Sequence, residues 1–326
     1  MKKLFILILI GFASQVWGQP TGSMDVQWSE GAPDCAAMPQ DPLQVHAYEP
    51  QTFILRQSLC ANFEANFIYL LIGSDKALLI DTGAVPDPEQ MPLAKMVLEL
   101  LPEQDGLKIP LVVAHSHGHR DHRAGDSQFV PLPSVQVVPV ELEGMQSFFG
   151  FEEWPNSIAQ LDLGGRTVYV IPAPGHHPSH LVFYDSKTAL LFSGDFLLPG
   201  RLIIDDVTAY HESAIRIVDF LNNHPVAHIL GGHIELDADG QLYAHGSQYH
   251  PNERRLELDE EDLLALPAAL ADFNGFYARH ENFTLSNPIH NLLALVVAVV
   301  VILALIAWGL TWFIRRRRRS VSNDGG

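Results

Sequence analysis

The hexapeptide His117–His122 most strongly constrains what this chain can fold into. It places three imidazoles and a carboxylate within six positions, a density of metal ligands that ordinary loop composition does not explain. The apolar run 109–114 comes directly before it and is typical of a buried strand. Functional residues tend to lie where a rigid strand ends and a loop begins. The pattern therefore predicts a metal site on a loop at a strand end.

Further ligand-type residues recur at the ends of later apolar runs. They are His176, Asp195 and His233. The expected strands are 63–72, 77–80, 111–114, 167–171, 181–184, 189–192 and 227–230, and helical spacing covers 91–101 and 213–221. Strands mixed with helices predict one layered α/β domain of about 200 residues, which is long enough to bury a sizeable core.

Both ends of the chain indicate export and membrane anchoring. Residues 1–18 have the basic start, apolar stretch and small final residues of a secretory signal peptide, although an uncleaved anchor is the alternative. Residues 292–314 are uncharged, and a helix of that length reaches about 35 Å, enough to cross a bilayer. Arg315–Arg319 follow at once, which places the tail 315–326 in the cytoplasm and the large N-terminal part on the periplasmic or other extracytoplasmic side.

The intervening chain divides by composition into three parts. Residues 19–44 carry Pro, Gly, Ser and Asp without periodicity and are expected to form a flexible lead-in. Residues 45–250 are expected to form the folded domain. Residues 251–291 are acidic and partly helical, for example over 260–273. We expect them to connect the domain to the membrane helix at 292–314, and a helix packed on the domain is equally allowed.

Charge and cysteine content narrow the function further. The net charge is −18, and because seven basic residues lie at the two ends, the exported part carries about −24. Such a surface excludes nucleic acid as a partner and disfavours strongly anionic substrates. The two cysteines, Cys35 and Cys60, lie in no nucleophile or metal motif. An oxidising compartment permits a disulfide between them, but the sequence leaves its geometry open.

Five elements in order resemble the metallo-β-lactamase superfamily of metal-dependent hydrolases. They are Asp81 after a strand, the hexapeptide His117–His122, Pro174–His180, Ser193–Asp195 and Gly232–His233. The resemblance runs from about residue 63 to residue 233. It implies an αββα sandwich whose metal ligands lie on loops at one edge of the two sheets.

The resemblance also implies two divalent metal ions. Asp195 would bridge them, and Asp81 and His180 would be supporting residues around the ligands. The two ligand groups would be His117, His119 and His176 for one ion, and Asp121, His122 and His233 for the other. Imidazole with carboxylate suits zinc, and iron or manganese would also fit.

Hydrolysis is the reaction expected from such a site. A bound divalent ion lowers the pKa of its water toward about 7, giving hydroxide at neutral pH, and Asp121 is the residue expected to handle the water's proton. In the family, β-lactamases mostly lack the bridging aspartate that thioesterases, lactonases and phosphodiesterases keep. Asp195 therefore favours a small ester, thioester or lactone as substrate. The alternatives are a β-lactam hydrolase, a phosphodiesterase and a non-catalytic metal-binding or sensing module.

Residues outside the ligand set give weaker signals. Tyr210 and His211 follow the bridging aspartate and are candidates for contact with the substrate. An aromatic group between the hexapeptide and His176 could line an apolar pocket, although core packing is the favoured role. Its members are Phe148, Phe149, Phe151 and Trp154.

Overall fold

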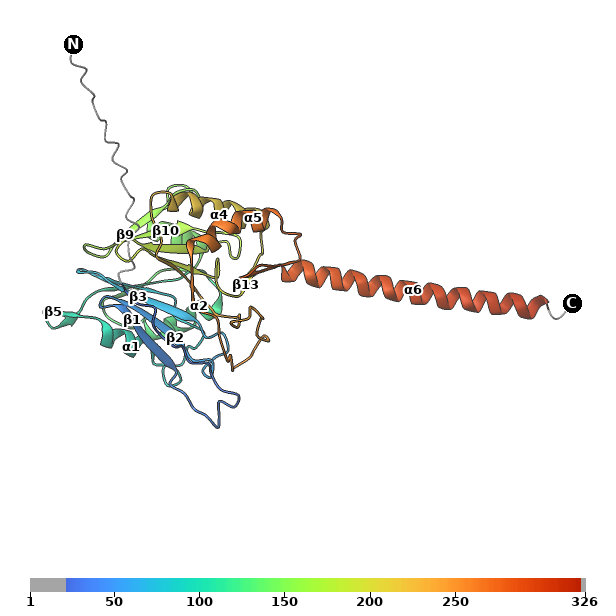
Figure 1. Ribbon diagram of the computed structural model, residues 1–326, viewed down its shortest axis with the longest axis horizontal. Coiled ribbons are helices and arrows are strands. Elements are labelled where there is room, and N and C mark those ends of the chain that lie inside the picture. Colours follow the sequence, from blue (N-terminus) through green and yellow to red (C-terminus); the bar gives the residue numbers. More distant parts are fainter. Residues whose placement is uncertain (1–21, 324–326) are drawn as a thin grey trace, which may run out of the picture.

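The computed structural model describes residues 22–323, with side chains described as far as Phe313. The expected signal peptide, 1–18, lies outside the described residues. Between these limits the chain forms a layered domain from which one long helix projects (Figure 1).

The first sheet has six strands, and its central strands are continuous apolar runs buried on both faces. Strands β1 to β4 pair antiparallel, and β4, β7 and β8 pair parallel. The strands are, in order across the sheet, β1 (Leu43–Glu49), β2 (Thr52–Gln57), β3 (Phe67–Ile72), β4 (Ala77–Ile80), β7 (Leu111–Ala114) and β8 (Val135–Val137).

The second sheet also has six strands. Only β12 and β14 pair parallel within it; the other neighbours are antiparallel. The strands are, in order across the sheet, β15 (Glu257–Leu258), β14 (His228–Gly231), β12 (Leu190–Gly194), β11 (Leu181–Asp185), β10 (Thr167–Pro172) and β9 (Ala159–Asp162).

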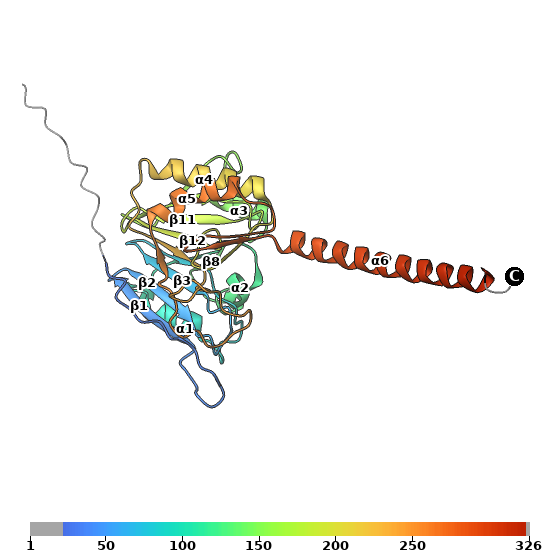
Figure 2. The same ribbon diagram turned by 45° about the vertical axis from the view of Figure 1, so that its right-hand side comes forward.

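The two sheets pack face to face, with helices on their outer faces (Figures 1 and 2). Tyr69 of β3 and Phe192 of β12 meet between the sheets, with ring centroids 4.6 Å apart. Helix α1 (Leu93–Leu100) buries its apolar face on the first sheet, and α4 (Val207–Leu221) and α5 (Glu260–Ala271) bury theirs on the second. The αββα sandwich is therefore confirmed.

Short elements complete the domain. The expected aromatic group at 148–154 packs against the core between the sheets, as favoured. The remaining short elements are the β5–β6 hairpin (Glu103–Gln104 and Leu107–Lys108), α2 (Arg120–Arg123), the 3-10 turn η1 (Ala124–Gln128) and α3 (Leu142–Phe149).

Helix α4 begins earlier than the apolar spacing predicted. It starts at Val207 rather than Ser213, because the Asp206 carboxylate accepts a hydrogen bond of 3.0 Å from the backbone N–H of Ala209. An aspartate before the first helical residue satisfies an otherwise unpaired N–H group and so fixes the start of the helix.

The folded part of the chain extends beyond the expected limits of 45 and 250. Residues 22–42 mostly follow irregular backbone, and residues 43 and 44 already belong to β1. The irregular part is bonded to the domain, for example by Ser23 N–H to Tyr48 O at 3.0 Å and by the Cys35–Cys60 disulfide. The expected lead-in is therefore attached rather than free. Likewise, the expected connector 251–291 supplies β15, α5 and two strands of a third sheet. These segments become part of the domain through contacts and strand pairing with distant parts of the chain, which local composition does not reveal.

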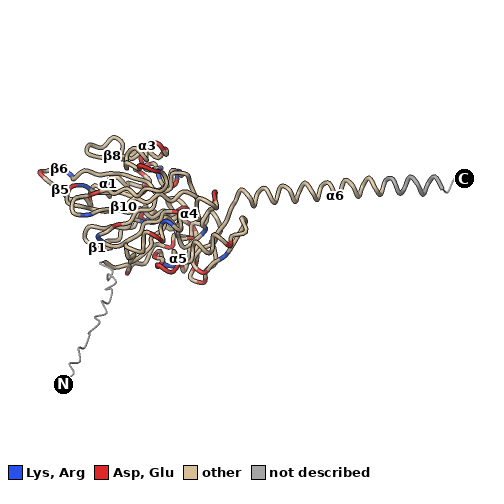
Figure 3. The backbone as a smooth tube through the Cα atoms, turned by 90° about the horizontal axis from the view of Figure 1, so that it is seen from above, with Lys and Arg blue, Asp and Glu red and all other residues tan. Residues whose placement is uncertain are grey.

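The third sheet joins the domain to the projecting helix. Its strands are, in order across the sheet, β13 (Arg201–Ile203), β17 (Thr284–Ser286) and β16 (Tyr277–Arg279). Helix α6 (Pro288–Asn323) follows β17. Its stretch Pro288–Phe313 contains an 18-residue window with a mean hydropathy of 3.0, and this window lies outside the core. In Figure 3, segments coloured as charged residues are spread over the domain, whereas the part of α6 that is not grey is tan throughout. By length and composition this helix could cross a membrane.

Candidate metal centre

All seven expected ligands follow the ends of strands, and their side chains meet in two neighbouring groups. Strand β7 leads to the hexapeptide, β10 leads to His176, β12 to Asp195 and β14 to His233. Strands β10, β12 and β14 run the same way because β10 and β12 are each antiparallel to β11, and β12 and β14 are parallel. The topology thus brings together residues that lie more than a hundred positions apart.

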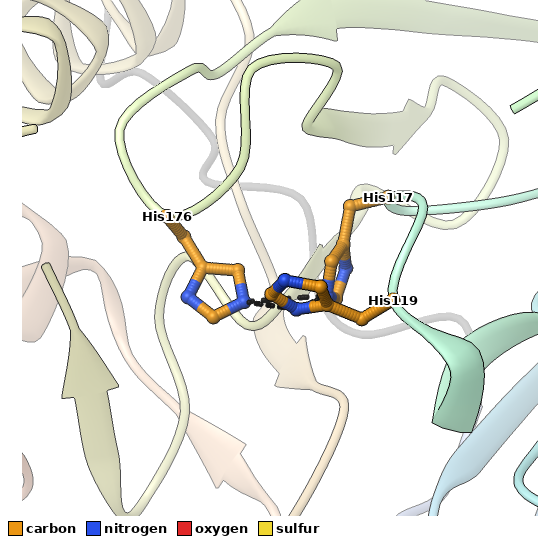
Figure 4. A group of neighbouring side chains, drawn as sticks. All are labelled: His117, His119 and His176. Atoms are coloured by element: carbon orange, nitrogen blue, oxygen red, sulfur yellow. Dashed lines mark hydrogen bonds between the residues drawn. The ribbon is translucent and has the colours of Figure 1, made fainter. Parts of the chain in front are cut away.

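Three histidines form the first ligand group (Figure 4). Nε2 of His117 lies 2.9 Å from Nδ1 of His119, and Nε2 of His176 lies 3.2 and 3.1 Å from these two atoms. Nδ1 of His176 donates to the carbonyl of Ile203 at 3.0 Å, which leaves the lone pair of its Nε2 facing the group. Burial, and then the surrounding imidazoles, lower the pKa of His117, so its ring is neutral and able to bind a metal.

The second group combines two histidines with two carboxylates. Nε2 of His122 lies 3.2 Å from Oδ2 of Asp121 and 3.3 Å from Nε2 of His233. Nε2 of His233 lies 3.5 Å from the same Asp121 oxygen. The Nδ1 of His233 donates to the carbonyl of Glu64 at 2.6 Å, so in the neutral ring it is the lone pair of Nε2 that faces the centre.

Asp195 lies between the two groups and turns one oxygen toward each. Its Oδ1 is 3.4 Å from Nε2 of both His122 and His233. Its Oδ2 is 3.6 Å from Nε2 of His176 and 3.9 Å from Nε2 of His117. Oδ1 is buried without a hydrogen-bond partner among the described residues. A buried carboxylate oxygen without a partner fits a place for a cation, because such an atom otherwise costs free energy.

The electrostatic environment around Asp195 favours a positive charge between the two ligand groups. Burial opposes ionisation of His233, yet Asp195 and the hydrogen bond to Asp121 raise its pKa to about 10. Burial likewise opposes ionisation of Asp195, but the facing His122 and His233 hold its pKa below the ordinary range. Burial also opposes ionisation of Asp121, but His122 and His233 lower its pKa below the ordinary range, so both carboxylates are ionised. The donor set of imidazole nitrogens and carboxylate oxygens fits divalent transition metals.

Comparison with known proteins identifies the family of the chain. Residues 61–233, just over half of the chain, match the metallo-beta-lactamase superfamily. The chain belongs to this superfamily.

Relatives in the superfamily carry hydrolase names. The acyl-coenzyme A thioesterase MBLAC2 of Homo sapiens is 25% identical over 219 residues, covering 56% of this chain and 77% of that protein. A hydroxyacylglutathione hydrolase of a Synechococcus strain is 32% identical over 142 residues, covering 41% of this chain and 50% of that protein. Among solved structures, a metallo-beta-lactamase from Pontibacter korlensis has a TM-score of 0.48 at 15% identity, covering 71% of this chain and 100% of that one. The expected hydrolase class is confirmed.

Asp81 lies behind the metal ligands of this superfamily member. Its Oδ1 accepts a hydrogen bond from Ser116 N–H at 2.7 Å, and its Oδ2 lies 2.9 Å from Nδ1 of His122. A carboxylate at Nδ1 fixes the ring orientation and leaves Nε2 to face the centre. The backbone of Asp81 has a φ of 68°, a conformation that aspartate tolerates better than most residues.

The other residues singled out in the sequence lie at different depths. His180 is fully buried and stacks on His117, with ring centroids 5.0 Å apart. Tyr210 is also fully buried, and its hydroxyl donates to the carbonyl of Phe196 at 2.5 Å. That position corrects the expectation of substrate contact, because the ring packs beneath the Asp195 loop.

His211 lies half-buried on α4. A further histidine, His115, lies two positions before the hexapeptide: its Nε2 is 2.8 Å from Oδ1 of Asp126, and it belongs to neither ligand group.

A groove beside His233 was missed by the sequence analysis. Its lining comes from three distant segments: Phe63, Glu64, Arg201, His233, Glu235, Tyr243 and His245. The segment after His233 has no helical or strand periodicity, so nothing in the sequence indicated that it folds back over the site. Its aromatic and histidine content over 242–250 was the only available signal.

Proposed function

We propose that this protein is an exported, membrane-anchored hydrolase with two divalent metal ions, acting on a small thioester, ester or lactone. The observation that carries the proposal is Asp195, which turns one carboxylate oxygen toward each ligand group. A carboxylate shared in this way fits two neighbouring ions better than one. Zinc suits the mixed imidazole and carboxylate donors.

The roles of the residues follow from their positions. The three histidines of the first group would hold one ion, and Asp121, His122 and His233 would hold the other. Bound divalent ions supply an ionised water at neutral pH and polarise the carbonyl of the substrate. Asp121 is 27% exposed, the most accessible of the carboxylates here, so its Oδ2 can accept a proton from water at the site. Asp81 would orient His122.

Relatives and charge support an acyl substrate. Two relatives are named for acyl groups carried on coenzyme A and on glutathione, both of which are thiols. A bond from an acyl group to a thiol is a thioester. The acidic surface of this chain disfavours a strongly anionic carrier, so we infer a carrier with little negative charge.

Export and anchoring are part of the proposal. The apolar stretch Pro288–Phe313 of α6 is exposed along its length and supports a membrane span. The arginines at 315–319 support a cytoplasmic tail, so the metal centre would lie on the other side of the membrane.

The test is metal analysis of the purified full chain, combined with a panel of thioesters, esters, lactones, a phosphodiester and a β-lactam. We expect about two metal ions per chain and turnover of the acyl compounds. Asp121→Ala should lose at least about a hundredfold in kcat while keeping its far-ultraviolet circular dichroism. Turnover of the β-lactam alone would refute the substrate class, and unchanged hydrolysis by the Asp121→Ala protein would refute the two-metal site.

A further inference from the structure

The base of α6 and the candidate metal centre share the third sheet. Strand β13 pairs in parallel with β17, so that Ile203 lies opposite Ser286. The carbonyl of Ile203 also accepts the hydrogen bond from Nδ1 of His176. A single strand therefore contacts both a metal ligand and the strand that leads into α6.

No flexible linker separates β17 from α6. Asn287 is the only residue between Ser286 and Pro288, and it is 2% exposed. Its side-chain oxygen accepts a hydrogen bond of 2.9 Å from the backbone N–H of His290. A buried capping residue at this junction fixes the direction in which the helix leaves the domain.

The first turn of α6 is also bonded to the turn before β16. Nδ1 of His290 donates to the carbonyl of Gly275 at 2.9 Å, and Nδ2 of Asn291 donates to the carbonyl of Phe276 at 3.1 Å. Phe276 and Tyr277 remain 44% and 49% exposed beside this junction. Aromatic side chains are favoured at the membrane–water interface. We call residues 274–279, which comprise this turn and the short strand β16, the membrane-proximal turn.

The groove beside His233 connects the candidate metal centre with the third sheet. Its lining includes both the candidate ligand His233 and Arg201 of β13. The chain just before the lining residue Tyr243 is bonded to the membrane-proximal turn, because Nη2 of Arg279 donates to the carbonyl of Gly240 at 2.5 Å. Figures 1 and 2 show α2 on the side from which α6 leaves, and Figures 1 and 3 show β5 on the opposite side.

The groove is poorly suited to an anionic head group. Arg201 is the one arginine or lysine among its described lining residues, and its guanidinium pairs with the Glu235 carboxylate at 2.8 Å. Glu64 adds a further acidic side chain to the lining. The ring of Phe63 meets that of His245, with centroids 5.1 Å apart, and gives the groove an aromatic wall.

We propose that the metal centre takes its substrate from the outer surface of the bilayer, and that this substrate is a long-chain acyl ester or thioester without strong negative charge. The inference rests on the proposed function, since it needs both acyl hydrolysis and a membrane-spanning α6. Water adds across the acyl bond: the carbon–sulfur or carbon–oxygen bond breaks, a new carbon–oxygen bond forms, and a proton passes to the departing thiol or alcohol. The fatty acid stays in the membrane.

A fixed position of the site near the membrane matters because a long-chain substrate partitions into the bilayer. Each methylene favours the bilayer over water by about fourfold, so a long acyl chain holds its ester at the membrane surface. A site fixed at that surface meets such a substrate at high local concentration. A site on a loose tether would spend most of its time elsewhere, whereas a short-chain, water-soluble substrate would reach either one equally.

The experiment uses the full chain in phosphatidylcholine vesicles and two thioesters of one neutral thiol, butanoyl and hexadecanoyl. A twelve-residue Gly/Ser insertion after Asn287 gives the domain a tether of about 20 Å. The matched control places the same insertion between Asp105 and Gly106 in the β5–β6 turn, where Gly106 has open space around it. We expect the first insertion to lower hexadecanoyl hydrolysis about tenfold and butanoyl hydrolysis less than about twofold. The control insertion should change neither.

A second variant keeps the junction intact. Phe276→Ser with Tyr277→Ser removes the aromatic contact with the interface and should lower hexadecanoyl hydrolysis about threefold with butanoyl hydrolysis unchanged. Leu107→Ser, an exposed apolar residue at the opposite edge, is its control. Unchanged hexadecanoyl hydrolysis in both the insertion variant and the double serine variant would overturn the inference, as would equal losses on both substrates. Butanoyl hydrolysis alone by the parent chain would overturn the inference and leave the proposed function standing. Failure of the parent chain on both substrates would overturn the proposed function itself.

Discussion

At the scale of single residues, the candidate metal ligands could be predicted from the sequence, but the groups that orient them could not. The hexapeptide and the later His176, Asp195 and His233 were identified because ligand types recur after apolar runs. The carbonyl of Glu64 that orients His233 comes from a segment 169 positions away, and any residue supplies a carbonyl. Such a contact leaves no trace in side-chain identity.

Asp81 offers a test of this supporting layer. In Asp81→Ala the buried N–H of Ser116 loses its acceptor, which should cost about 1–3 kcal/mol in the free energy of unfolding. His122 loses its Nδ1 partner, so metal affinity should fall about 10–100-fold. Asp81→Asn keeps an acceptor oxygen and tolerates the positive φ, and it should therefore recover most of the stability but not the affinity. Chelator competition and thermal unfolding measure the two effects, and equal affinity in all three proteins would contradict the role.

Tyr210 separates a structural role from contact with the substrate. Its hydroxyl donates to the carbonyl of Phe196, and its ring stacks on that of Phe196 with centroids 4.6 Å apart. Tyr210→Phe keeps the ring and should cost about 1 kcal/mol, lowering the melting temperature by about 2–4 °C with KM unchanged. Ile215→Ala, an exposed position on the same helix, is the control. A raised KM with an unchanged melting temperature would restore the original expectation of substrate contact.

At the scale of elements, continuous apolar runs were predicted well and paired segments were not. Strands β3, β4 and β7 are buried along their whole length and were found at the expected places, although β3 begins at Phe67 rather than at 63. Strands β13 and β17 have three residues each and lie about 80 positions apart. Pairing between such short segments depends on the rest of the fold, so local periodicity could not show it.

The disulfide is the element whose removal is easiest to interpret. Cys35 and Cys60 are 25 residues apart and are the two cysteines of the sequence, so a reductant acts on this bond alone. Closing a loop of that length stabilises a domain by about 3 kcal/mol. We expect Cys35→Ser with Cys60→Ser to lower the melting temperature, and reductant to lower that of the parent chain to the same value. A further drop when reductant is added to the double variant would show an effect unrelated to the bond.

At the scale of the whole molecule, the sequence predicted the layers, the ligand edge and the projecting helix, but not the rigid junction between domain and helix. From composition alone, residues 251–291 were expected to form a connector. The structure instead makes that segment part of the fold, so the metal centre is held at a fixed place relative to α6. The candidate metal centre and helix α6 therefore belong to one folded unit rather than to two modules joined by a tether.

The orientation of this device is the remaining prediction, and it depends on charge at the two sides of α6. Arg315–Arg319 should hold the C-terminus in the cytoplasm, because arginine is retained on that side of a membrane helix. A fluorescent protein that matures only in the cytoplasm, fused after Gly326, should therefore fluoresce, while protease added to spheroplasts or intact cells should digest the domain and spare the fusion. Replacing the five arginines with glutamine should lower the fluorescent fraction without changing the apolar stretch of the helix. A dark fusion on the parent chain, with the domain protected from protease, would place the metal centre in the cytoplasm and contradict the proposed topology.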